Sequence, residues 1–146
     1  MDSNVFVEAL KGDNEAKEIL RKLYHSNFRV FINDVVFSEV MYHFIRIKVG
    51  SYWSAKKNPD RVSVAVEEFE KVVLPMLAIP DLLEVNYEVS TIAIRLSKTY
   101  GMLPNDALIL ATAEYYGVDT IVSFDRDFSK ACKEEGVSLV SSSKEL

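Results

Sequence analysis

The chain has 146 residues, 49% apolar and 27% charged, enough for one domain that buries a core without disulfides or structural metal. It has no apolar run long enough to cross a bilayer and no secretory-signal pattern at its start, so we expect no membrane partner. The single cysteine, Cys132, excludes an intramolecular disulfide, so we expect a cytoplasmic protein in which Cys132 is a small packing residue. The formal net charge of −5 argues against nucleic-acid binding through overall charge alone.

Periodicity, helix caps and Gly or Pro breaks predict a regular alternation of elements along the chain. In chain order they are helices 4–10 and 14–25, strand 29–33, helix 34–49, a polar loop at 50–60, helix 61–77 (bent or ended by Pro75), strand 82–86, helices 87–100 and 104–116, strand 119–124, helix 127–135 and strand 137–140. Strands that alternate with helices indicate a three-layer α/β/α sandwich around a central, mostly parallel sheet. Without repeats or linkers, the chain is expected to form one domain over residues 1–146.

Two carboxylates stand two residues apart where the predicted strand 119–124 should end, in the stretch "SFDRDF" (123–128). In open parallel sheets, ligand sites gather beyond the carboxyl ends of the strands. A solvated turn would explain one aspartate, whereas the pair Asp125 and Asp127 also suits a cation or a substrate. This stretch alone leaves both interpretations open.

Three further acids stand next to a strand end or a helix start. Asp106 occupies the first turn of helix 104–116, where the helix dipole favours a carboxylate and could by itself account for the residue. Glu39 lies one turn into a helix whose start is apolar, so it either has a partner or occupies a narrow polar strip. Asp2, taken alone, would be an ordinary helix cap.

If these five acids converge, the pKa of each carboxyl rises because like charges repel. A hard divalent ion removes that repulsion, and Mg²⁺ or Mn²⁺ prefers carboxylate oxygen and water. His25 and His43 are isolated in the sequence, so no spacing supports a zinc site.

Basic and aromatic residues concentrate in one segment, 46–61. Its five cations and one anion give a charge of +4, which leaves −9 for the rest of the chain. A solvated helix end and loop would account for the segment, but its aromatic residues can also stack on bases. The candidate nucleic-acid contacts in this segment are Arg46, Lys48, Trp53, Lys56, Lys57 and Arg61.

The order and spacing of four motifs resemble the PIN domain, the metal-dependent nuclease fold that includes VapC-type toxins. The motifs are "DSNV" (2–5), "SEV" (38–40), "NDALILATA" (105–113) and "TIVSFDRDF" (120–128). Position by position, the resemblance implies an acidic catalytic quartet of Asp2, Glu39, Asp106 and Asp125, an additional acid at Asp127, and supporting polar residues at Asn4 and Ser123.

The sequence departs from this family at one place. The family's first strand is central in its sheet and precedes its first aspartate, whereas only Met1 precedes Asp2 in this numbering. We therefore expect the first central strand to be largely missing upstream of Asp2. A sheet without it would leave unpaired backbone edges on two neighbouring strands, so we expect residues outside this numbering, or an exchanged segment, to fill that place.

The resemblance implies cleavage of RNA or single-stranded nucleic acid by metal-activated water, with Mg or Mn as the cofactor. Asp2, Asp106 and Asp125 are expected to bind the metal, and Asp127 to bind a second ion or support the first. Glu39 either binds the metal, directly or through water, or positions the nucleophile.

The expected partners are RNA or single-stranded nucleic acid, an antitoxin protein and, in a homodimer, a second copy of the chain. Arg126, between the paired carboxylates, is expected to contact substrate or solvent. A PIN-like binding or assembly module with little or no catalysis is the alternative, and metal-dependent cleavage of single-stranded RNA would distinguish the two. A third interpretation, phosphoryl transfer on "DRD", lacks the positioned Lys and the Ser/Thr motif that such enzymes use.

Overall fold

The computed structural model describes residues 1–146, and most of them lie in helices. The α-helices are α1 (Ser3–Lys11), α2 (Asn14–His25), α3 (Asp34–Val49), α4 (Tyr52–Lys57), α5 (Pro59–Val72), α6 (Leu74–Leu77), α7 (Tyr87–Tyr100), α8 (Pro104–Tyr116) and α9 (Phe128–Glu135). The strands are β1 (Phe31–Asn33), β2 (Asp81–Leu83), β3 (Thr120–Val122) and β4 (Ser138–Val140), and a 3-10 helix, η1 (Ser143–Glu145), ends the chain.

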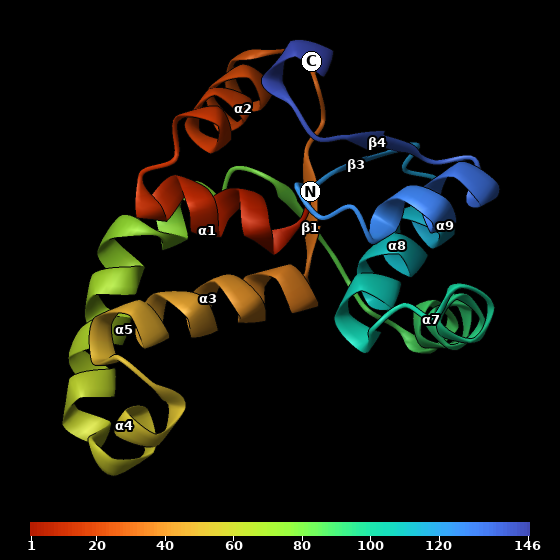
Figure 1. The fold of residues 1–146 in the computed structure, drawn as a ribbon. Coiled ribbons are helices and arrows are strands. Elements are labelled where there is room, and N and C mark those ends of the chain that lie inside the picture. The colour runs from red at the N-terminus through yellow and green to blue at the C-terminus, as the bar shows by residue number, and fades with distance from the viewer.

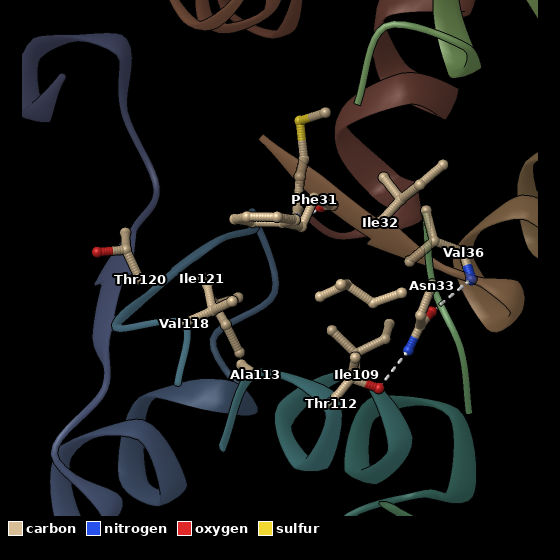
Figure 2. Close-up of a pocket in the computed structure, with 12 residues that line it drawn as sticks. Phe31, Ile32, Asn33, Val36, Ile109, Thr112, Ala113, Val118, Thr120 and Ile121 are labelled. Atoms are coloured by element: carbon tan, nitrogen blue, oxygen red, sulfur yellow. Dashed lines mark hydrogen bonds between the residues drawn. The ribbon is translucent and has the colours of Figure 1, made fainter. Parts of the chain in front are cut away.

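Asn33, the last residue of β1, determines where α3 begins. Its Oδ1 accepts the backbone N–H of Val36 at 3.0 Å, and thereby pairs one of the donors that a first helical turn leaves free. Its Nδ2 donates to Oγ1 of Thr112 in α8 at 2.8 Å. One buried side chain therefore starts α3 and joins it to α8, as the dashed lines in Figure 2 show.

The strands form two parallel pairs. Phe31, Ile32 and Asn33 of β1 lie opposite the three residues of β2, and Thr120, Ile121 and Val122 of β3 lie opposite those of β4. No other internal strand joins the two pairs into one sheet.

The first two residues of the chain lie between these pairs. The Met1 amine donates to the carbonyl of Phe31 at 2.8 Å, and the Asp2 N–H donates to the carbonyl of Val122 at 3.0 Å. Met1 and Asp2 therefore occupy the end of a strand position between β1 and β3.

Helices lie on both sides of the strands, which confirms the predicted α/β/α arrangement. In Figure 1, α1, α3 and α5 lie to one side of β1, and α7, α8 and α9 lie to the other. Helix α7 packs along α8, and α3 packs along α5. A continuous apolar core that includes Phe6, Ile19, Leu110, Ile121 and Phe128 joins these layers. None of the helices is both long and apolar enough to cross a membrane.

Some element boundaries differ from those predicted. Residues 50–60 contain a helix, α4, which Ser51 starts by accepting the N–H of Ser54 at 3.1 Å. The single helix expected at 61–77 is divided at Val73, and Pro75 lies in the first turn of α6, where a missing N–H is tolerated. Each strand has only three paired residues, and β2 begins at Asp81.

Candidate active site

Asp2 is a buried carboxylate at the start of α1, with 4% of its surface exposed. Its Oδ1 accepts the N–H of Ser3, and its Oδ2 accepts the hydroxyl of Ser123, both at 2.6 Å. Burial raises the pKa of Asp2, although the hydrogen bonds from Ser123 and Ser3 oppose that rise. The same side chain therefore caps α1 and joins it to the end of β3.

Ser123 connects the strand end to α1 through one hydroxyl. The residue is fully buried, and besides its bond to Asp2 its Oγ accepts from Asn4 Nδ2 and from the N–H of Asp125, each at 3.0 Å. The Oδ1 of Asn4 in turn accepts the N–H of Phe124 at 3.3 Å. Asn4 and Ser123 thus hold the loop after β3 against the first turn of α1.

Glu39 lies in α3 with both carboxylate oxygens hydrogen-bonded to neutral groups. The hydroxyl of Ser3 donates to Oε2 at 2.7 Å, and Nδ2 of Asn105 donates to Oε1 at 2.6 Å. These contacts bring together the starts of α1 and α8 on the half-buried Glu39. Sequence reasoning missed Ser3 and Asn105. Each directly neighbours a predicted acid and lies inside one of the quoted motifs, "DSNV" (2–5) or "NDALILATA" (105–113).

The pKa of Asp106 depends on the charge of every other acid in the predicted set. Its pKa is raised from 3.8 to about 6, first by burial and then by the charges of Asp2, Asp125, Glu39 and Asp127, in that order. Such an effect requires that the carboxylates lie close enough to repel one another. The structure therefore brings these five acids into one electrostatic environment.

Asp125 and Asp127, in the stretch that follows β3, differ in hydrogen bonding and in exposure. Oδ1 of Asp125 accepts the N–H of Asp127 at 2.8 Å, so the predicted solvated turn accounts for part of this pattern. Asp125 is half-buried, whereas Asp127 and Arg126 are exposed. Arg126 and Lys144 line an open polar hollow that also contains Asp125.

The basic segment 46–61 lies at the other end of α3 from the acids. Glu39 and Arg46 are separated by roughly 10 Å along the helix axis at 1.5 Å per residue. In Figure 1, α4 lies at the end of α3 that points away from the N-terminus. Trp53 is 69% exposed, and Lys48 pairs with Glu68 of α5. This segment is therefore a separate surface that only an extended ligand could share with the acids.

The donor set fits a hard divalent ion, although it forms no ready-made cage. No three His, Cys, Asp or Glu side chains lie close enough together to make a preformed metal-binding group. The five acids nevertheless offer only carboxylate oxygen, and their mutual repulsion would be relieved by a cation. His25 is exposed, and the ring of His43 packs against Tyr42. Cys132 is buried in α9, where burial raises its pKa to about 11.

Residues 1–134 match the family model of the PIN domain, and the chain belongs to this family. Two proteins of Methanocaldococcus jannaschii are similar to it over most of their length. Ribonuclease VapC6 is 36% identical over 137 residues, which cover 89% of this chain and 90% of the relative. Ribonuclease VapC2 is 34% identical over 130 residues, which cover 88% of this chain and 85% of the relative.

Two solved structures share the fold. A toxin-antitoxin complex from Klebsiella pneumoniae has a TM-score of 0.62 at 21% identity over 88% of both chains. FitAcB from Neisseria gonorrhoeae has a TM-score of 0.67 at 20% identity, over 99% of this chain and 97% of that one. At this level of identity the likeness concerns the fold alone, and it agrees with the α/β arrangement described above.

Proposed function

We propose that this PIN-domain protein is a ribonuclease that hydrolyses phosphodiester bonds of RNA or single-stranded nucleic acid at the acidic site. The observation that carries the proposal is the pKa of Asp106, which is raised to about 6 by burial and by four neighbouring acids. Acids that repel one another in this way are arranged to attract a cation, and a cation reverses the local sign so that an anionic phosphodiester can approach. The names of the two M. jannaschii relatives support RNA as the substrate class.

The cofactor in this proposal is Mg²⁺ or Mn²⁺, held by Asp2, Asp106 and Asp125. Asp127, which is exposed, would support that ion or bind a second one. When bound, such an ion activates water and neutralises charge that develops on the phosphate. A site whose ligands are all oxygen atoms favours these ions over Zn²⁺.

The neutral residues of the site hold the acids in place without cancelling their charge. Ser123 and the N–H of Ser3 orient Asp2, and the Ser3 hydroxyl and Asn105 orient Glu39. None of these donors is a cation, so none of them neutralises the carboxylates with an opposite charge. Both carboxylate oxygens of Glu39 are held by these hydrogen bonds. Glu39 then either binds the ion, directly or through water, or positions the nucleophile.

The basic segment is the proposed surface for the rest of the RNA strand. The rings of Tyr52 and Trp53 are exposed side by side, and the Lys56 ammonium lies 5.2 Å from the centroid of the Tyr52 ring. Lys57 and Arg61 are exposed nearby in the sequence. A strand that crosses α3 would contact this segment through stacking and phosphate pairing, while Arg126 contacts it beside the acids.

We further propose that the protein is a cytoplasmic toxin with an antitoxin partner, and that it forms a homodimer. The structural neighbour from Klebsiella pneumoniae supports the partner, since it is a toxin-antitoxin complex. Induced expression should arrest growth of the host cell, and Asp106→Asn should not. A partner encoded beside this gene should restore growth.

Single-turnover cleavage of a labelled single-stranded RNA tests the proposed activity. Wild type should cleave with Mg²⁺ or Mn²⁺ and not with a chelator, and Asp106→Asn and Asp125→Asn should each abolish cleavage without unfolding the protein. Asp119→Asn, which changes an exposed aspartate just before β3 and outside both the acids and the basic segment, is the matched control and should cleave normally. Metal-independent cleavage, or wild-type rates in the Asp106 and Asp125 variants, would contradict the site. RNA binding without any cleavage would favour the binding-module alternative.

A further inference from the structure

The open polar hollow that contains Asp125 also reaches the loop before η1. Its wall includes Asn4 of α1, Ser141 and Ser142, and only one apolar residue, Phe124. Its volume of about 900 Å³ lies in the range of sites that take a ligand of nucleotide size. The hollow therefore continues the acidic site with a polar surface rather than with an apolar one.

Two cations on this wall have no carboxylate partner. Arg126 and Lys144 both line the hollow and are exposed. Neither side chain takes part in any ion pair of the chain. A guanidinium and an ammonium that are free of internal partners can both donate to the oxygens of a phosphate.

Three acids also line the hollow, but each has a local role in the protein. Glu8 pairs with Lys11 at 2.7 Å. Asp13 caps α2 by accepting the N–H of Ala16 at 2.8 Å, where the helix dipole offsets its charge. The third acid, Glu15, holds the C-terminal turn. The acids of the wall are therefore engaged, whereas its two cations are free.

The backbone that carries Lys144 is fixed against α2. Oε1 of Glu15 accepts the N–H of Ser143 at 2.6 Å and the hydroxyl of Ser142 at 3.0 Å. The ammonium of Lys22 donates to the carbonyl of Ser143 at 2.6 Å. Lys144 is therefore presented to the hollow from a defined position, although its own side chain is unpaired.

The backbone of Arg126 is fixed by the turn that follows β3. Oδ1 of Asp125 accepts the N–H of Asp127 at 2.8 Å, and the carbonyl of Arg126 accepts the N–H of Ser129 at 2.9 Å. Asp125 and Arg126 are adjacent in this turn, and both line the hollow. A strand held at the acids would therefore meet Arg126 as it entered the hollow.

We propose that the hollow is a phosphate subsite, in which Arg126 and Lys144 together bind the phosphate next to the scissile one. This inference rests on the proposed ribonuclease function and adds Lys144 to the residues that hold the substrate. In Figure 1 the C-terminal end of the chain and α4 lie on opposite sides of the N-terminus. An RNA strand that crosses the acids therefore has the hollow on one side and the basic segment 46–61 on the other.

The test measures binding of a labelled single-stranded RNA of mixed sequence to the full chain, with Mg²⁺ present and in the Asp106→Asn background. Lys144→Ala and Arg126→Ala should each weaken binding by about 5-fold or more, because each removes a charged contact to phosphate. Lys144→Arg should restore most of the affinity, since it keeps the charge. Lys98→Ala, at an exposed lysine of α7, is the control and should bind normally.

The double variant Arg126→Ala with Lys144→Ala distinguishes one shared phosphate from two separate contacts. If both cations hold the same phosphate, the two losses should be non-additive, and the double variant should bind little more weakly than either single variant. Fully additive losses would overturn the shared subsite. Urea unfolding should be the same for all of these variants, because both side chains are exposed and unpaired.

Unchanged binding by Lys144→Ala would overturn the inference, as would an equal loss in Lys98→Ala or the absence of any RNA binding. Cleavage by the wild-type protein together with unchanged binding by Lys144→Ala would overturn the subsite alone. The predicted losses of binding, in a protein whose wild-type form does not cleave RNA, would support the subsite and contradict the ribonuclease proposal. The two proposals therefore fail separately.

Discussion

The side-chain amide of Asn105 donates to Oε1 of Glu39 at 2.6 Å, across 66 residues of sequence. This bond joins the first turn of α8 to α3. The Ser3 hydroxyl donates to the other carboxylate oxygen, Oε2 of Glu39, at 2.7 Å. Both oxygens are therefore directed by neutral donors. The position of the carboxylate, rather than its charge, is what Asn105 controls.

Asn105→Ala should lower the single-turnover cleavage rate by roughly 10-fold to 100-fold, a typical effect of losing a residue that orients a site carboxylate. Asn105 is exposed, so the free energy of unfolding should change by less than about 0.5 kcal/mol. Cleavage kinetics and urea unfolding measure the two quantities. Asn27→Ala, at an exposed asparagine just after α2, is the control and should cleave normally. An unchanged rate in Asn105→Ala would show that Glu39 needs no such support.

Ser123→Ala should reduce the free energy of unfolding by about 1–3 kcal/mol. It removes one hydroxyl that pairs with Asp2, Asn4 and the N–H of Asp125, and leaves buried polar atoms without partners. Urea unfolding measures the loss, and Ser138→Ala, on the exposed position of β4, is the control. If the two variants were equally stable, Ser123 would not connect α1 to the end of β3.

Metal-free wild type should lose stability through Asp106 as the pH rises from about 4 to about 6. The pKa of Asp106 is raised from 3.8 to about 6, so between these values the folded state holds a proton that the unfolded state releases. Asp106→Asn should therefore be more stable than wild type at neutral pH, and this difference should shrink toward zero below about pH 4.

Urea unfolding with a chelator, from about pH 4 to about pH 7.5, measures this difference. The comparison is made between the two proteins because other groups also titrate in this range. Burial lowers the pKa of the Met1 amine to about 6, which acts in the opposite direction in both proteins. Parallel pH profiles for wild type and variant would show that Asp106 is not under the influence of the other acids.

Mn²⁺ or Mg²⁺ should stabilise the wild-type protein, because the ion binds the folded site and relieves its repulsion. At a concentration one hundredfold above the dissociation constant the gain is about 2.7 kcal/mol, which corresponds to several degrees in melting temperature. The double variant Asp106→Asn with Asp125→Asn should gain little from metal and should be the more stable protein without it. Identical responses of the two proteins to Mn²⁺ would mean that these carboxylates do not form one site.

Lys57→Ala should weaken RNA binding for all sequences to a similar degree, because a phosphate contact carries no sequence information. The slope of log affinity against log salt should become shallower by about 0.7 for each phosphate of a single strand that the variant no longer neutralises. Binding is measured in the Asp106→Asn background so that the RNA stays intact, with Lys98→Ala on α7 as the control. An unchanged slope would show that the bound RNA does not contact α4.

The acids could be predicted from the sequence because each stands beside a local signal. Asp125 follows the β-branched run that forms β3, and Asp106 follows Pro104 at the start of α8. The partners of Glu39 could not be predicted, because Ser3 and Asn105 lie 36 and 66 residues away in the chain. Their side chains carry no pattern of their own, and only the packing of α1, α3 and α8 brings them to one carboxylate.

By itself the sequence determined the order of the strands and of most helices, since caps, glycines and apolar periodicity act over a few residues. The tertiary structure alone decided two other features. It separates the basic segment around Trp53 from the acids by the length of α3, and it leaves β1 and β3 facing each other across Met1. Both depend on distances between segments remote in sequence, which local propensity does not encode. The raised pKa of Asp106 has the same origin, because charges interact through space.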